Sequence, residues 1–106
     1  MVFAQLDDTD KAFDYLQRAL KLRPAYPEAL NNLGVLYMRT NREQQAVQTF
    51  EQCIRVAPSF DQSYLNLARV YALQNDPAKA RGVLLALLKQ HPGDEQATAL
   101  MKELGQ

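Results

Sequence analysis

The fold of this chain is decided by residues 30–58, which read LNNLGVLYMRTNREQQAVQTFEQCIRVAP. From Leu30 to Tyr37, apolar residues recur every three or four positions, which is the spacing of one face of an α-helix. After a short polar stretch, a second apolar series begins at Ala46 and continues to the residue before Pro58. Proline lacks an amide donor and its ring clashes with the preceding helical turn, so Pro58 ends the second helix. The stretch predicts two antiparallel helices joined by a tight turn.

Three residue types recur along the chain at a fixed interval of 34 residues. A fixed interval indicates one structural unit that is copied along the chain. Each unit must bury its apolar stripe against the neighbouring units, because a single helix pair cannot bury it alone. The interval therefore predicts an all-α repeat array. Its three series are Ala12, Ala46 and Ala80; Pro24, Pro58 and Pro92; and Phe3, Tyr37 and Tyr71.

The order of key residues within one unit identifies a family. It is Leu30-x2-Leu33-Gly34-x2-Tyr37, followed by Ala46-x3-Phe50 and Pro58, and the next copy reads Tyr64-x2-Leu67-Ala68-x2-Tyr71, Ala80-x3-Leu84 and Pro92. This pattern resembles the tetratricopeptide repeat, whose signature is W-x2-L-G-x2-Y, A-x3-F and P. Leu30 and Tyr64 stand where the signature has tryptophan. The resemblance implies a right-handed α-solenoid of antiparallel helix pairs with a C-terminal capping helix.

We expect a single domain over residues 1–106. It should contain a partial repeat over 1–26 that lacks most of its first helix, full repeats over 27–60 and 61–94, and a capping helix over 95–106. Helices are expected near 1–6, 9–22, 27–40, 43–56, 61–74, 77–90 and 95–104. We interpret the N-terminus as a cut through a longer array and the C-terminus as native.

The turns between helices carry their own signals. Asp7, Asn41 and Asn75 occupy the same place in three copies, and Asn and Asp tolerate the left-handed conformation that closes many helices. Asp76 precedes a proline and suits the N-cap of the following helix. Asp8 or Thr9 is expected to cap the helix that carries Ala12.

The composition argues against several function classes. Lys plus Arg equals Asp plus Glu at 12 each, so the chain lacks the basic excess typical of proteins that bind nucleic acid or anionic membranes. No apolar run approaches the roughly 20 residues that span a bilayer. The single cysteine cannot form an intrachain disulfide. We expect a soluble chain that inserts into no membrane, with the cytoplasm and a bacterial source favoured.

The search for catalytic residues finds no convincing constellation. Cys53 lies on an apolar helix stripe and is interpreted as a core residue. His91 has no acidic or cysteine partner at ligand spacing and is interpreted as a surface residue. A metal site usually needs three or four convergent ligands, and the sequence contains no such cluster. We therefore expect no enzyme activity, no metal and no cofactor.

The resemblance implies that the first helix of each pair lines a concave, partner-binding groove. Asn32 and Asn66 are 34 residues apart, and an Asn side chain can both donate to and accept from a peptide backbone. They are similar to the asparagine ladder of the arrays in O-linked sugar transferases. Alternatively, Asn recurs because the repeats share ancestry or because it bonds a neighbouring helix. The candidate groove residues are Asn31, Asn32, Val35, Met38, Arg39, Gln62, Leu65, Asn66, Arg69 and Leu73.

The candidate groove also limits the class of partner. Arrays that bind the acidic C-termini of heat-shock chaperones resemble one another in a clamp of Lys, Arg and Asn. Here the lysine positions of that clamp hold Glu28, Gln62 and Leu65, which argues against it. Arg39 and Arg69 still make the groove locally cationic. We expect a protein or peptide partner with an acidic group and an apolar anchor.

The leading hypothesis is a non-catalytic protein-interaction module that forms the C-terminal part of a larger scaffold or assembly protein. One alternative is a structural array that associates with itself or docks on its parent. Another is a regulatory appendage of an enzyme domain located upstream. An incomplete first repeat would leave apolar surface uncovered at the N-terminal end, and such surface favours association between copies. The residues expected there are Phe3, Phe13, Leu16 and Leu20.

Overall fold

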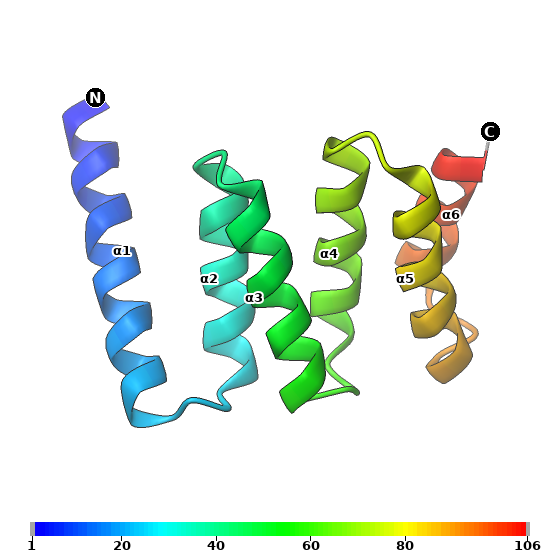
Figure 1. Cartoon of the computed structure of the whole chain (residues 1–106), viewed down its shortest axis with the longest axis horizontal. Helices are drawn as coiled ribbons and strands as arrows, with labels where there is room; N and C mark the ends of the chain where they lie inside the picture. Colours follow the sequence, from blue (N-terminus) through cyan, green and yellow to red (C-terminus); the bar gives the residue numbers. More distant parts are fainter. Residues whose placement is uncertain (1, 106) are drawn as a thin grey trace.

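The computed structural model describes residues 2–105, and side chains within 8–105, as an all-α helical-repeat solenoid (Figure 1). The described residues form six helices and no strand. None of these helices is both long enough and apolar enough to cross a membrane. The helices are α1 (Val2–Leu22), α2 (Pro27–Arg39), α3 (Glu43–Val56), α4 (Asp61–Leu73), α5 (Pro77–Gln90) and α6 (Glu95–Gly105).

The helices from α2 to α6 are arranged in two layers. One layer contains α2, α4 and α6, because α4 contacts both of the others, and α3 and α5 form the layer in front of it (Figure 1). Each front helix packs between two helices of the rear layer: α3 between α2 and α4, and α5 between α4 and α6. Helix α1 differs, because α2 is the only described helix it packs against.

The core of the full repeats is built at the predicted positions. Ala46, Phe50, Ala80 and Leu84 are fully buried, and Leu33 and Leu67 are nearly so. Gly34 is needed where α2 meets α3, because a Cβ at this residue would lie 2.5 Å from Cε1 of Phe50. The predicted close contact at Gly34 is therefore confirmed. Tyr37 and Tyr71, which were also expected in the core, are only half-buried.

Tyr64 of α4, which stands where the family signature has tryptophan, links its helix to the turn between α3 and α4 and to the end of α5. Its hydroxyl donates to the carbonyl oxygen of Pro58 at 2.6 Å and accepts from Nε2 of Gln90 at 2.9 Å. The ring itself is 5% exposed. The hydroxyl of this buried tyrosine is therefore fully hydrogen-bonded, as buried tyrosine hydroxyls usually are.

The turns after α2 and α4 form as their sequences predict. Asn41 and Asn75 adopt positive φ angles of 62° and 59°, in the left-handed region that ends many helices. Asp76 caps α5, since its Oδ1 accepts from the backbone amide of Lys79 at 3.3 Å. Pro77 follows as the first residue of that helix, where its missing amide donor costs nothing.

The predicted turn at Asp7 is wrong. The expected helices over 1–6 and 9–22 are one continuous helix, α1, and neither Asp8 nor Thr9 is an N-cap. The stretch from Asp7 to Asp10 contains neither Gly nor Pro, so its amides can bond within a helix. A turn there would break those hydrogen bonds. Their loss would be offset only if the preceding residues folded back and packed on α1.

Replacing Gly34 with leucine should lower the free energy of unfolding by about 1–3 kcal/mol, because the new side chain would overlap the Phe50 ring. Urea unfolding measures the change. Gly82→Leu is the matched control, since a Cβ at Gly82 in α5 meets nothing within 4 Å. That control should be neutral or stabilising, because glycine is unfavourable inside a helix. Equal losses in both variants would contradict the close contact.

Candidate functional site

The predicted groove residues lie on α2 and α4, in the layer formed by α2, α4 and α6, whose outer surface we call the groove face. Leu65 is buried and is a core residue, so it cannot contact a ligand. Asn66 is also buried, at 7% exposure. The remaining eight residues are at least partly accessible. Asn31, Val35 and Met38 are half-buried, and Asn32, Arg39, Gln62, Arg69 and Leu73 are exposed.

A row of polar side chains links α2 to α4 across the groove face. Nδ2 of Asn66 donates to Oδ1 of Asn31 at 3.0 Å, and a guanidinium nitrogen of Arg69 donates to Oδ1 of Asn66 at 3.1 Å. Both sides of the Asn66 amide are therefore used within the chain. Asn66 bonds a neighbouring helix, as the alternative interpretation allowed, and it holds Arg69 in place. Of the two proposed ladder residues, only Asn32 is exposed.

Next to this row lies an apolar hollow of about 430 Å³ between α2, α4 and α6. Arg69 stands at its edge, so a cationic group and an apolar depression are adjacent. Sequence reasoning missed the contribution of α6, because nothing in the sequence shows that the last helix reaches this surface. The lining residues are Met38, Arg69, Ala72, Leu73, Leu100 and Glu103.

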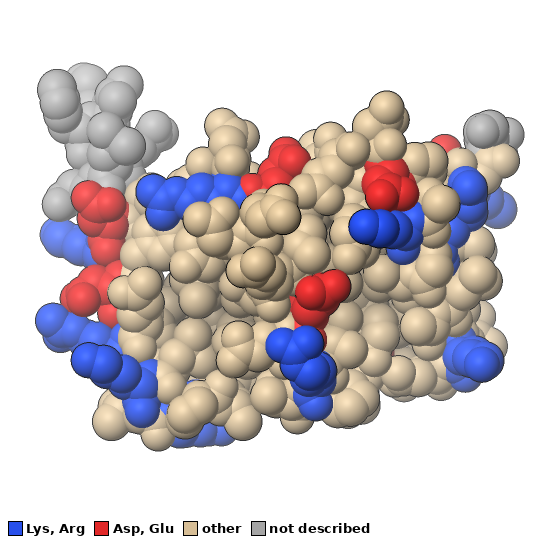
Figure 2. All heavy atoms as spheres, in the orientation of Figure 1, with Lys and Arg blue, Asp and Glu red and all other residues tan. Residues whose placement is uncertain are grey.

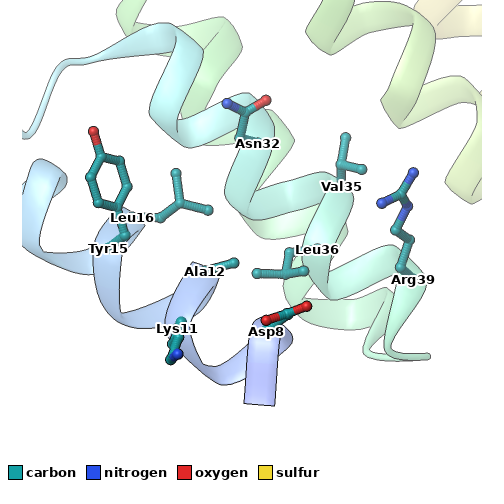
Figure 3. Close-up of a pocket in the computed structure, with 9 residues that line it drawn as sticks. All are labelled: Asp8, Lys11, Ala12, Tyr15, Leu16, Asn32, Val35, Leu36 and Arg39. Atoms are coloured by element: carbon teal, nitrogen blue, oxygen red, sulfur yellow. The ribbon is translucent and has the colours of Figure 1, made fainter. Parts of the chain in front are cut away.

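A second hollow, of about 560 Å³, lies between α1 and α2 (Figure 3). Ala12, Leu16 and Leu36 point toward one another across its floor, whereas Tyr15 stands at one side (Figure 3). Three predicted groove residues line it from α2. They are Asn32, Val35 and Arg39.

The groove face carries charges of both signs, since Glu103 lines the same hollow as Arg69 and Glu28 is exposed on α2. Arg39 and Arg69 are exposed, and no carboxylate among the described side chains forms an ion pair with either guanidinium. Figure 2 shows the opposite layer, where Lys and Arg alternate with Asp and Glu and no large area carries a single sign. The net charge of the chain is zero, so it does not reveal the two exposed arginines on the groove face.

The predicted association patch is partly covered by α2. The Phe13 ring lies 5.3 Å from the Tyr37 ring, centroid to centroid, and the Arg42 guanidinium lies 5.3 Å above the Phe13 ring. Leu16 is 9% exposed and Leu20 is half-buried. The side chain of Phe3 lies outside the described residues. Helix α2 thus covers part of this stripe, while Phe13 and Leu20 stay partly exposed and Leu16 lines an open hollow, and association between copies stays a prediction.

The two candidate reactive residues have structural roles. Cys53 is buried, and its Sγ donates to the carbonyl oxygen of Pro27 at 3.4 Å. Burial raises the pKa of the Cys53 thiol above its ordinary value, which disfavours the nucleophilic thiolate.

His91 was expected to lack an acidic partner, but its Nδ1 lies 2.9 Å from Oδ2 of Asp61. This pair joins the end of α5 to the start of α4. Within the described part of the chain, no group of three or more His, Cys, Asp or Glu residues could hold a metal ion.

Comparisons with known proteins agree with this architecture. A family profile described as "Tetratricopeptide repeat" matches residues 3–59 and again residues 41–104. The peroxisomal targeting signal receptor of Saccharomyces cerevisiae is 31% identical over 91 residues, which are 86% of this chain and 15% of that receptor. This chain thus spans a small part of the length of that relative.

Solved structures of similar shape come from other proteins. The first TPR domain of Spaghetti (RPAP3), bound to the HSP90 peptide SRMEEVD, is similar with a TM-score of 0.83 and 16% identity, over 97% of this chain and 82% of that one. MamA is similar with a TM-score of 0.77 and 25% identity, over 83% of this chain and 52% of that one.

Replacing Asn66 with alanine should cost about 0.5–1.5 kcal/mol of stability, because Asn31 and Arg69 each lose a hydrogen bond. Thermal or urea unfolding measures the loss. Asn32→Ala is the matched control one repeat earlier, since Asn32 is exposed and should change stability little. Equal stability of the two variants would contradict the structural role of Asn66.

The Cys53 thiol should make the fold less stable in alkali. Its pKa is raised in the folded state, so above about pH 8.5 the unfolded chain releases the proton first and unfolding becomes more favourable. The pKa of the half-buried Tyr71 is raised in the same direction, by burial and by the neighbouring Glu51 carboxylate. Between pH 7.5 and pH 9.5 the free energy of unfolding should therefore fall more for the parent than for Cys53→Ala. Identical slopes would show that Cys53 does not contribute.

Proposed function

This chain belongs to the tetratricopeptide repeat family, and from that premise we propose that it is a non-catalytic protein-interaction module of a larger scaffold or assembly protein. Its groove face binds an extended peptide segment of a partner. The bound segment carries an acidic group, which pairs with the exposed arginines, and an apolar side chain, which fills the hollow between α2, α4 and α6.

The observation that carries this proposal is the position of Arg69. Its guanidinium is held by Asn66 at 3.1 Å, and the same residue lines the hollow that Met38 and Leu73 make apolar. A positioned guanidinium loses less conformational entropy on binding than a free one. A peptide with an acidic group close to an apolar side chain would therefore pair the acidic group with Arg69 and bury the apolar side chain in the hollow.

Related proteins support the class of ligand without supplying its identity. The RPAP3 domain holds an HSP90 peptide, SRMEEVD, which is both acidic and apolar near its end. The yeast relative is named as a receptor for a peroxisomal targeting signal. In this chain Glu28 and Gln62 replace the lysines expected of a chaperone clamp, so the ligand should rely on Arg39 and Arg69 instead.

The proposal is tested by selecting phage-displayed random heptapeptides on the immobilised chain. Peptides that combine Asp or Glu with Leu, Met or Phe should be enriched, and their affinity should fall as salt rises. Fluorescence anisotropy of a selected peptide then measures its dissociation constant. The absence of any enriched sequence, or enrichment of basic sequences alone, would overturn the proposal.

For a selected peptide, Arg69→Gln should weaken binding by about 0.2–1 kcal/mol, because an exposed ion pair contributes no more than that. The salt dependence should become shallower at the same time. Arg55→Gln is the matched control, since Arg55 is an exposed arginine on α3, in the other layer. Equal effects of both substitutions would indicate general charge attraction and not binding at the groove face.

A further inference from the structure

Helices α3 and α5 do not contact each other, and α4 lies behind the space between them (Figure 1). An apolar hollow of about 410 Å³, which we call the α3–α5 hollow, lies here on the face of the molecule shown in Figure 2. Helix α2 packs on α3 and helix α6 packs on α5, so the chain itself bounds this place on both sides. The apolar and aromatic lining consists of Ile54, Tyr64, Tyr71, Gly82, Val83 and Ala86.

The α5 wall of the hollow is made by small residues where α3 has glutamines. Subtracting 34 from the numbers of Gly82 and Ala86 gives Gln48 and Gln52, which are exposed on α3. A Cβ added at Gly82 would meet nothing within 4 Å, so open space lies directly above the α5 backbone. The hollow therefore results from a difference between two internal repeats, which replaces long polar side chains by a surface that another backbone can approach closely.

Lysines stand at both ends of this wall. Residues 79, 82, 86 and 89 follow one side of α5, because they are three and four positions apart. Lys79 and Lys89 are thus about 15 Å apart along the helix, with only Gly82 and Ala86 between them on this side. Lys89 is exposed and forms no ion pair with a carboxylate among the described side chains, whereas Nζ of Lys79 lies 3.9 Å from Oδ2 of Asp76.

The two ends of the hollow differ in charge. At one end, Glu51 and Lys79 line the same polar depression, and Oε2 of Glu51 accepts from the Tyr71 hydroxyl at 3.3 Å. At the other end, Arg55 of α3 is the counterpart of Lys89 one repeat earlier. Arg55 is exposed and also lacks an ion pair among the described side chains. The second end therefore carries a cation on each wall.

We propose that the α3–α5 hollow binds one amphipathic helix of a partner protein. The helix lies along α5, places large apolar side chains above Gly82 and Ala86, and directs an acidic side chain toward Arg55 and Lys89. This is helix-in-groove recognition, with the apolar positions of the ligand three or four residues apart. The inference goes beyond the proposed function, because the hollow lies in the layer opposite the groove face.

A second copy of this chain fits the hollow less well than such a helix. A two-fold contact sets the same surface of both copies against each other. Whether the two α5 helices run parallel or antiparallel, each lysine of the pair Lys79 and Lys89 would face a lysine of the other copy. Like charges that face each other at an interface are unfavourable, whereas an acidic partner helix meets the same lysines with opposite charge.

A designed peptide serves as the probe. It is an alanine-based helix of 15 residues with leucine at its sixth and tenth positions and glutamate at its third and thirteenth, which is the spacing of residues 79, 82, 86 and 89. Glutamate at both ends lets the peptide bind in either direction. A covalent link on its far side holds it helical, since a free peptide of this length is only marginally helical.

A second peptide with lysine in place of each glutamate is the matched control. We expect one acidic peptide to bind per chain, and the basic peptide to bind at least about tenfold more weakly. Fluorescence anisotropy measures both dissociation constants. Absence of binding by the acidic peptide, or equal binding of the two peptides, would overturn the proposal.

Restoring the glutamines of the preceding repeat should close the hollow. Gly82→Gln and Ala86→Gln should each weaken binding of the acidic peptide at least about tenfold, because the new side chains occupy the space of its leucines. Ala99→Gln, at an exposed alanine of α6, is the control and should leave binding unchanged. Gly82→Gln should not lower the melting temperature, because glutamine is a better helix former than glycine. Unchanged binding to folded Gly82→Gln would overturn the site.

The charge requirement has its own variants. Lys89→Gln should weaken binding about two- to fivefold and make its salt dependence shallower, because an exposed ion pair contributes no more than that. Lys79→Gln should have a smaller effect, since its ammonium already lies near Asp76. Lys102→Gln, at an exposed lysine of α6, should change nothing. Equal losses in all three variants would indicate general charge attraction and overturn the pairing.

Sedimentation of the chain without peptide tests the other occupant. A monomer is expected, and a dimer that Gly82→Gln dissociates would show that a second copy fills the hollow and would overturn the partner helix. Arg69→Gln separates this site from the groove face, because it should weaken binding of a selected heptapeptide and leave the acidic helix bound as tightly as before. Displacement of the acidic helix by that heptapeptide would place both ligands on one surface and overturn the separate site.

Discussion

The close approach of α2 to α3 at Gly34 is the constraint on which the rest of the array depends. The Phe50 ring occupies the space where a Cβ of residue 34 would lie, and it is 0% exposed there. Because side chains in a packed core cannot shift freely, this contact fixes how α2 is rotated about its own axis. That rotation decides which α2 residues face α4 and which face solvent. Asn31 meets Asn66, and Arg39 remains exposed, as consequences of a glycine on another face of the same helix.

Local signals were sufficient for most of the fold but not for α1. The predicted bounds of the helices from α2 to α6 agree with the observed ones within a residue, because Pro and Asn set those ends through their own backbone preferences. Asp7 occupies the same repeat position as Asn41, yet the chain continues as a helix through it. A turn at this position needs a packed helix before it, and sequence periodicity alone does not report whether that packing exists. At Asp7 the local signal was weak, so tertiary packing determined whether a turn or a continuous helix formed.

The location of the candidate site stays a prediction, and the structure changes several of its details. Repeat register placed the candidate groove on α2 and α4, and the structure shows one exposed arginine of the candidate set on each of these helices. It also paired Asn32 with Asn66, whereas the observed hydrogen bond joins Asn66 to Asn31. Residues 34 apart occupy equivalent places in successive repeats, so they need not touch, and side chains that do touch across neighbouring helices belong to different repeat positions. The contribution of Leu100 and Glu103 depends on the path of α6, which no periodic pattern reports.

Function in such an array should be concentrated where the repeats differ. Positions such as Ala46 and Ala80 keep the same residue because the same helix crossing recurs, and both are fully buried. At the surface the copies diverge: Val35 becomes Arg69, and Arg39 becomes Leu73. These exchanges move the positive charge from one end of α2 to the middle of α4 and replace it with an apolar side chain. A ligand that lies along the groove face would therefore contact charged and apolar side chains in a fixed order. A perfectly periodic array would present the same surface at every repeat and could not fix the register of its ligand.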